Sequence, residues 1–277
     1  VNAIIYILKN QRYAMLSPAE TAKNYVFIAQ NKTSYKWYKT LILAVFAGIF
    51  IAVASMLATV AGSGYDGVKA ILIKAAVFPV GLILITLSGS ELFTGNCLLL
   101  APALSRDVKI SAALKNLAIV YGGNFAGAIL IALIAVFSGL MSNETATACV
   151  AAAAAKCEIG FFGAFLRAVP CNVLVCFAVL ISSSSNSVAG KVLAVYPPIF
   201  TFVACGFEHS IANMYYLTSG LLTAAKYGYS VKSLTAGSAI LNSLLPSTLG
   251  NIVGGMVFVA IPLWLIYLKK SRNSASD

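Results

Sequence analysis

The sequence predicts an all-α membrane protein with six transmembrane helices, and three observations lead to this fold class. The 277 residues are 60% hydrophobic and 10% charged, whereas soluble domains carry about 25% charged residues. Apolar segments recur along the chain, and each is long enough to cross a bilayer as a helix of ~20 residues. An internal repeat relates the first three segments to the last three. The six segments are residues 41–61, 71–104, 116–140, 161–182, 192–224 and 236–267.

Residues 1–40 precede the first apolar segment and are predicted to form a cytoplasmic region that contains an amphipathic helix. The motif "SPAE" places Ser17 at the N-cap, Pro18 at the first helical position and Glu20 at the third, which is the pattern of a capping box. Residues 25–28 supply an apolar stripe, and lysines follow it. We expect this helix to lie along the membrane surface; a helix surrounded by solvent is the alternative.

The second and fifth segments are too long for one straight crossing and too short for two. Residues 71–104 and 192–224 are apolar over most of their length, but one crossing needs only about 20 residues. A helix broken near the middle of the membrane would account for both lengths. The sequence therefore predicts that transmembrane helices 2 and 5 are broken.

The distribution of the cations predicts the orientation of the chain. The net charge is +11, but the lysines and arginines lie between the apolar segments and not on one folded face, so we expect no nucleic-acid partner. Most of the 19 cations fall before segment 1, between segments 2 and 3, or after segment 6. The positive-inside rule then places both termini in the cytoplasm. The expected location is the cell (inner or plasma) membrane, with the lipid bilayer around a multi-pass chain.

The repeat is visible in two pairs of stretches. Residues 89–96 read "GSELFTGN" and residues 206–213 read "GFEHSIAN", so both follow G-x-E-x-x-x-x-N. Residues 111–127 and 238–254 also match each other at several positions. Because each copy has three crossings, the second must enter from the opposite side, as in transporters with inverted repeats. The predicted units are residues 41–140 and 161–267, joined by an outer connection at 141–160 and followed by a cytoplasmic tail at 268–277.

The repeated motif falls near the middle of each overlong segment and indicates where its helix breaks. Glycine weakens a helix, and an acid at membrane depth needs a partner. We expect the two glutamates to accept hydrogen bonds from the backbone N–H groups that each break leaves free. Asn124 and Asn251 also match across the repeat, and the small residues near them favour close helix packing. The predicted helix-break scaffold is Gly89, Glu91, Asn96, Gly206, Glu208 and Asn213.

His209 is the only histidine of the chain, and the first copy has Leu92 in its place. A difference within a symmetric frame indicates function, although a histidine hydrogen-bonded in the core is the simpler alternative. Two further polar residues are open to two interpretations. Asn172 either lines a pore or joins two helices, and Lys156 either marks the membrane interface or attracts anions. The six cysteines lack the spacing of metal ligands, so we expect neither a metal nor a cofactor.

These motifs, with "GGNFAG" at 122–127, "RAVPCNVLVC" at 167–176 and "LLPSTLGNIVGG" at 244–255, resemble the formate/nitrite transporter family over about residues 16–270. The resemblance implies an aquaporin-like fold and a homopentamer with one pore in each protomer. It also implies that His209 is the central pore residue, that Thr94 and Asn172 line the same chamber, and that Lys156 lies in a vestibule. The resemblance assigns the apolar constrictions to Leu82, Phe93, Val175 and Phe202.

The predicted function is a channel or proton-coupled transporter for small monovalent anions of weak acids. Lys156 would draw the anion in, and His209 would protonate it or donate a hydrogen bond to it between the apolar constrictions. Formate, nitrite and hydrosulfide all fit, with formate as the first choice. A pore for water or small neutral solutes is the alternative. We do not expect an enzyme, because His209 has no evident nucleophile as a partner and the chain has no G-x-S-x-G motif.

Overall fold

The computed structural model describes residues 15–269, and every regular element in that range is a helix. This confirms the predicted all-α class. Residues 1–14 of the predicted N-terminal region and 270–277 of the predicted tail lie outside the described residues. The first element, α2 (Pro18–Ser34), begins with the predicted capping box, in which Ser17 and Glu20 bond reciprocally. Its inner face buries Ala22, Tyr25 and Ala29 against the bundle.

Among residues 15–269, five helices are long and apolar enough to cross a membrane. They are α3 (Trp37–Gly62), the pair α4 (Gly67–Val77) and α5 (Val80–Ser88), α8 (Ile110–Phe137), α10 (Phe161–Ser182), and a continuous run from Ala236 to Leu268. That run consists of α13 (Ala236–Ser238), η2 (Ala239–Leu244), α14 (Leu245–Gly255), η3 (Met256–Ala260), α15 (Ile261–Leu263) and η4 (Trp264–Leu268). A separate helix, α9 (Asn143–Glu158), connects α8 to α10.

Two overlong segments of the sequence contain an irregular stretch between helices. In the first, α5 ends at Ser88 and the next helix begins at Phe93. In the second, α11 (Val188–Ala204) is followed by α12 (Ser210–Tyr227). Gly89 and Gly206 have φ angles of 71° and 67°, a left-handed conformation that glycine adopts without strain. After the first stretch the chain continues through α6 (Phe93–Asn96), η1 (Cys97–Leu99) and α7 (Leu100–Leu104).

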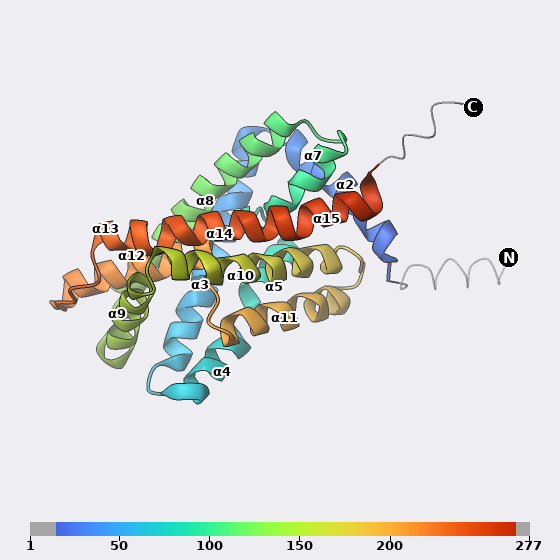
Figure 1. Cartoon of the computed structure of the whole chain (residues 1–277). Helices are drawn as coiled ribbons and strands as arrows, with labels where there is room; N and C mark the ends of the chain where they lie inside the picture. The colour runs from blue at the N-terminus through green and yellow to red at the C-terminus, as the bar shows by residue number, and fades with distance from the viewer. Residues whose placement is uncertain (1–14, 270–277) are drawn as a thin grey trace, which may run out of the picture.

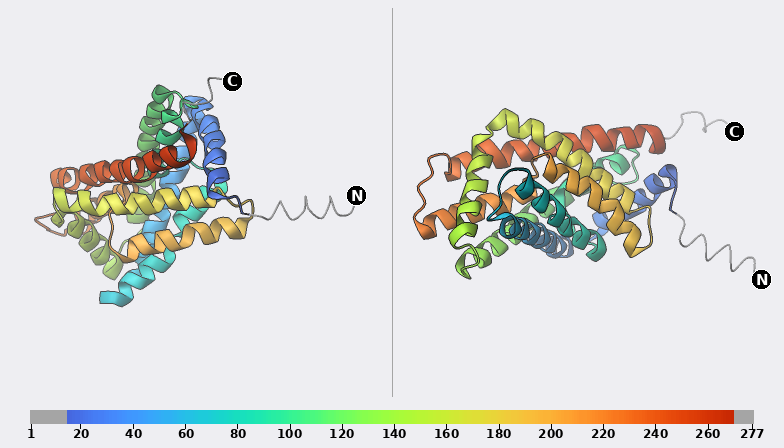
Figure 2. Two further views of the ribbon diagram at one scale, coloured as in Figure 1. Left: turned by 45° about the vertical axis from the view of Figure 1, so that its right-hand side comes forward. Right: turned by 90° about the horizontal axis from the view of Figure 1, so that it is seen from below.

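Two helix pairs hold these irregular stretches in place. α3 packs along α8, and α10 packs along α14. Figure 1 and the left view of Figure 2 show α10 and α14 side by side. Glycines let the backbones approach: a Cβ on Gly127 of α8 would overlap the carbonyl oxygen of Val45, and one on Gly254 of α14 would overlap that of Val169. Such close contact is typical of membrane helices with small residues at their interface.

Candidate functional site

The first helix break is fastened by the side chain of Asn124, on α8. Its Oδ1 accepts a hydrogen bond of 2.9 Å from the N–H of Phe93. This N–H lies at the start of α6, where the helix itself offers no acceptor for it. Its Nδ2 donates to the carbonyl of Glu91 at 2.9 Å and to that of Ala44 on α3 at 2.7 Å. One buried amide therefore satisfies backbone groups within the break and at the start of α6, and ties them to α3.

The second break is fastened in the same way by Asn251, on α14. Its Oδ1 accepts the N–H of Ser210 at 2.8 Å, and its Nδ2 donates to the carbonyls of Glu208 at 3.0 Å and Ala168 at 2.8 Å. The sequence assigned these free N–H groups to the two glutamates, and that expectation is wrong. The matched asparagines accept them, because an amide offers an acceptor and two donors at one point, whereas a carboxylate only accepts.

The carboxylates of Glu91 and Glu208 instead bind side chains. Glu91 is 1% exposed and lies 3.0 Å from Nζ of Lys32 and 2.6 Å from Nδ2 of Asn96. Sequence reasoning missed Lys32, which comes from α2. Lys32 also donates to Oδ1 of Asn96 at 2.9 Å. The only signal for such a partner in the sequence was that a buried acid needs a cation, and that segment 2 has no cation next to Glu91.

Glu208 has a corresponding set of partners. Both carboxylate oxygens lie 3.0 Å from Nζ of Lys156, which comes from α9, and Oε2 lies 2.7 Å from Nδ2 of Asn213. Each break therefore has a lysine, a glutamate and an asparagine in one cluster, and in each the lysine comes from a helix outside the broken segment. The positive charge of the lysine and the negative charge of the glutamate cancel in each cluster.

His209 lies at the N-cap of α12, and its two ring nitrogens have different partners. Nδ1 accepts the N–H of Ala212 at 3.2 Å, so in this arrangement Nδ1 carries a lone pair. The proton of the neutral ring is then on Nε2, which lies 3.0 Å from Oγ1 of Thr94. The imidazole ring also stacks on Phe202, with ring centroids 5.7 Å apart. The site thus points one N–H donor at the hydroxyl of Thr94.

Asn172, on α10, links the helix that follows the first break to α14. Its Nδ2 donates to the carbonyl of Thr94 at 3.1 Å and to that of Asn251 at 2.7 Å. Its Oδ1 is buried and has no hydrogen-bond partner among the described residues. The structure therefore brings Thr94, Asn172 and His209 close together, as expected for residues of one chamber. Thr94 and Asn172 are fully buried, and of the three only His209 lines a cavity among those formed by the described residues.

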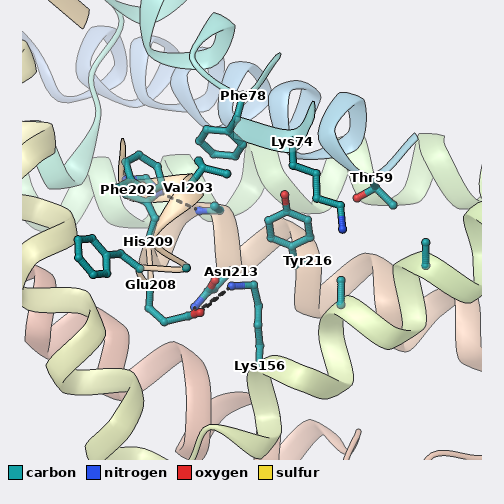
Figure 3. A pocket seen from close by; sticks show the side chains of 15 residues that line it. Thr59, Lys74, Phe78, Lys156, Phe202, Val203, Glu208, His209, Asn213 and Tyr216 are labelled. Carbon is teal, nitrogen blue, oxygen red and sulfur yellow. Dashed lines mark hydrogen bonds and ion pairs between the residues drawn. The ribbon is translucent and has the colours of Figure 1, made fainter. Parts of the chain in front are cut away.

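Three cavities follow one another around this cluster. One of ≈ 190 Å³ contains Lys156, Glu208 and His209 in its wall and is called here the Lys156 vestibule (Figure 3). One of ≈ 290 Å³ has Lys32 and Glu91 in its wall and is called the Lys32 vestibule. A central cavity of ≈ 10 Å³, about the space of one water molecule, is lined by Ile51, Phe78, Leu82, Leu92, Val175, Ile199, Phe202 and His209.

Three of the four predicted constriction residues, Leu82, Val175 and Phe202, line the central cavity. Phe93 lines none of the three cavities and packs edge-on against Tyr121, with ring centroids 4.8 Å apart. Sequence reasoning missed Leu92, which lines both the central cavity and the Lys32 vestibule. The repeat contained the signal, because Leu92 is the counterpart of His209.

The fold and the cavities define a class: a multi-pass helical membrane protein with two polar vestibules and an apolar centre. Comparison with known proteins gives the family. A model of the formate/nitrite transporter family matches residues 19–265. The chain belongs to the formate/nitrite transporter family, as its motifs indicated, and the family is one of anion channels and transporters.

Relatives match over most of their length. The chain is 36% identical over 276 residues to a "Probable formate transporter" of Methanothermobacter thermautotrophicus, with 92% of this chain and 98% of the relative covered. It is 32% identical over 282 residues to the formate channel FocA of Escherichia coli (strain K12), with 94% and 98% covered.

Two solved structures have the same fold. A "Pentameric formate channel with formate bound" has a TM-score of 0.74 and 34% identity, and the match covers 84% of this chain and 98% of that one. An "FNT family ion channel" has a TM-score of 0.81 and 25% identity, with 89% and 98% covered. These similar proteins are named as transporters and channels, not as enzymes.

Proposed function

We propose that the protein is a channel or proton-coupled transporter for small monovalent anions of weak acids, with formate as the first substrate to test. One observation carries the proposal. His209 lines both the apolar central cavity and the Lys156 vestibule, and its ring is hydrogen-bonded to Thr94. The relatives that are named as formate transporters and channels support formate as the substrate.

In this proposal the chain crosses the membrane six times, as an aquaporin-like inverted repeat of three and three helices with helices 2 and 5 broken. The matched roles of Asn124 and Asn251 support the repeat. Both termini face the cytoplasm, so the Lys32 vestibule opens to the inside and the Lys156 vestibule to the outside. The chain assembles as a homopentamer, by analogy with the pentameric formate channel.

The central cavity sets the energetic problem. An anion that leaves water for an apolar constriction loses several kcal/mol of hydration. In the neutral ring, Nε2–H of His209 donates to Oγ1 of Thr94, which frees the hydroxyl proton of Thr94 to bond the anion. Each hydrogen bond polarises the next, so the negative charge is partly delocalised as the anion crosses.

The hydrogen-bond pattern favours this polarising role over storage of a proton on His209. An imidazolium carries N–H groups on both nitrogens. Protonation of Nδ1 would set its N–H against the N–H of Ala212 and remove that hydrogen bond. We therefore expect a proton that crosses with the anion to come from the vestibule water.

The test is flux into proteoliposomes with formate, nitrite and hydrosulfide at two pH values. His209→Asn should retain folding and lower the uptake of the anions at both pH values, because an amide does not have the reach of the imidazole to Thr94. An unchanged flux and pH profile would show that His209 takes no part.

A pore for water or small neutral solutes remains the second candidate, because the central cavity is lined by apolar side chains apart from His209. Osmotic swelling with water and glycerol separates the two functions. Swelling without flux of any of the three anions would favour the neutral pore and overturn the proposal.

A further inference from the structure

Two lysines that the proposed mechanism does not use occupy matched positions in the two vestibules. Lys74 lies on α4 and lines the Lys156 vestibule, and Lys191 lies on α11 and lines the Lys32 vestibule. They are separated by the same offset as Glu91 and Glu208, so each is the other's counterpart in the repeat. Both are half-buried.

The charges of the vestibules show what these lysines add. In residues 15–269, the ion pairs join Lys32 to Glu91 and Lys156 to Glu208, and neither pair includes Lys74 or Lys191. Among the described residues, Glu208 is the one carboxylate in the wall of the Lys156 vestibule, and Glu91 is the one in the wall of the Lys32 vestibule. Each wall therefore keeps one positive charge that no described carboxylate neutralises.

The side chain of Lys74 is directed by its surroundings. Its stem crosses Gly62 at the end of α3 so closely that a Cβ on Gly62 would overlap its Cε. Figure 3 shows Lys74 and Lys156 reaching the hollow from opposite sides, with Tyr216 between them. An ammonium has three N–H donors. No carboxylate among the described residues forms an ion pair with the ammonium of Lys74.

We infer that Lys74 and Lys191 are the residues that capture a small monovalent anion at the two mouths of the pathway, before it reaches His209. The inference rests on the proposed anion transport. It shifts the attracting charge away from Lys156, because Glu208 neutralises that lysine. Lys156 and Lys32 instead hold the carboxylates at the breaks.

The physical basis is the field of a charge in a narrow, low-dielectric cleft. Such a cleft raises the local concentration of counter-ions, and salt weakens the effect. A capture site changes flux when the anion is scarce and has little effect when the site is saturated. Because a passive pore obeys detailed balance, removal of the charge at one mouth lowers flux at low concentration equally in both directions.

The first experiment measures formate flux into proteoliposomes for Lys74→Gln and Lys191→Gln. We expect each substitution to lower flux at low formate and low salt by about threefold to tenfold, with the saturating rate within about twofold. The deficit should shrink at high ionic strength. Lys74→Arg should retain the flux because it retains the charge.

Each variant has a matched control that removes the same charge outside the cavities. Lys69→Gln is on the same helix as Lys74, but Lys69 lies over the ring of Tyr65, 4.3 Å from its centroid. Lys109→Gln is exposed and lies at the N-cap of α8, outside the wall of the Lys32 vestibule. Both controls should transport formate like the unchanged protein.

A second experiment restores the charge chemically. Cys205 is the exposed cysteine among the described residues, and the other five cysteines are buried, so Lys74→Cys is made together with Cys205→Ser. A thiol reagent that leaves an ammonium group should raise formate flux, and one that leaves a sulfonate should lower it further. The same pair of reagents should leave Cys205→Ser alone unchanged.

The outcomes separate the two proposals. If the unchanged protein carries none of the three anions, the proposed function fails. If it carries formate but Lys74→Gln and Lys191→Gln match their controls, or Lys74→Arg loses as much flux as Lys74→Gln, the capture role is overturned and the proposed function stands.

Discussion

The two helix breaks, at residues 89–92 and 205–209, are held by the same kinds of hydrogen bonds and ion pairs but carry different side chains next to the central cavity. In both, an asparagine from a neighbouring helix binds the free backbone groups, and a lysine and an asparagine bind the buried glutamate. At the residue before the new helix, the first break has Leu92 and the second has His209. Two positions on, the first has Thr94 and the second has Ile211.

This difference shows how a repeated frame acquires an asymmetric site. Each break contributes one polar side chain where the other has an aliphatic one, and the two polar groups meet at 3.0 Å although they are 115 residues apart. The shared residues therefore position the backbone, and the unshared pair supplies the chemistry. Four experiments test this comparison, and they are given in order of decreasing effect on stability.

The largest effect is expected where a buried carboxylate loses its cation. Lys156→Met leaves Glu208 unpaired, which should destabilise the protein by about 3–5 kcal/mol. Lys32→Met should do the same at Glu91. Thermal unfolding of the purified protein in detergent measures both. The double variant Lys156→Met/Glu208→Gln should recover most of the loss, and no recovery would mean that Lys156 stabilises the fold by other contacts.

Loss of an asparagine at a break should have the next largest effect. Asn251→Ala leaves one buried N–H and two carbonyls without their partner, and a buried donor left unsatisfied costs about 1–3 kcal/mol. Asn124→Ala should match it, because both side chains make the same three bonds. Amide hydrogen exchange at Phe93 and Ser210 reports the effect. A much larger loss in one copy would show that the two breaks are not equivalent.

A smaller effect is expected from the glycines between paired helices. Gly127→Ala and Gly254→Ala each place a methyl against a facing carbonyl, and such overpacking costs about 1–3 kcal/mol. Gly122→Ala is the matched control on α8, since a Cβ there meets nothing within 4 Å. Thermal stability should fall for the first two and stay the same or rise for Gly122→Ala. Equal stabilities would contradict the close approach.

The smallest effect on stability, and a large one on transport, is expected from His209→Leu. This change gives the second break the residue that the first break already accommodates as Leu92. The swap loses two hydrogen bonds, to Ala212 and Thr94, which contribute about 0.5–1.5 kcal/mol each. The buried apolar surface of leucine offsets part of this loss, so the free energy of unfolding should fall by about 1 kcal/mol. Formate flux should fall, because the N–H donor of His209 is lost. A protein that fails to fold would show that His209 belongs to the scaffold.

Much of this arrangement could be predicted from the sequence because it is local or repeated. Apolar segments of bilayer length indicated the spanning helices, and Ser17 and Glu20 indicated the start of α2. The repeated motif marked both glycines with positive φ. Lys32 could not be found in this way, because its position in the N-terminal region does not indicate which buried acid it reaches.

The sequence by itself determined the class of protein, the family, and the uniqueness of His209 within the repeat, since composition and motif order need no contacts. Only the tertiary structure decided what each polar residue does. It assigned the free N–H groups to Asn124 and Asn251, paired Lys156 with Glu208, and left Lys74 without an ion pair. The physical reason is that a buried polar group takes its role from the partner that reaches it, and here those partners come from other helices.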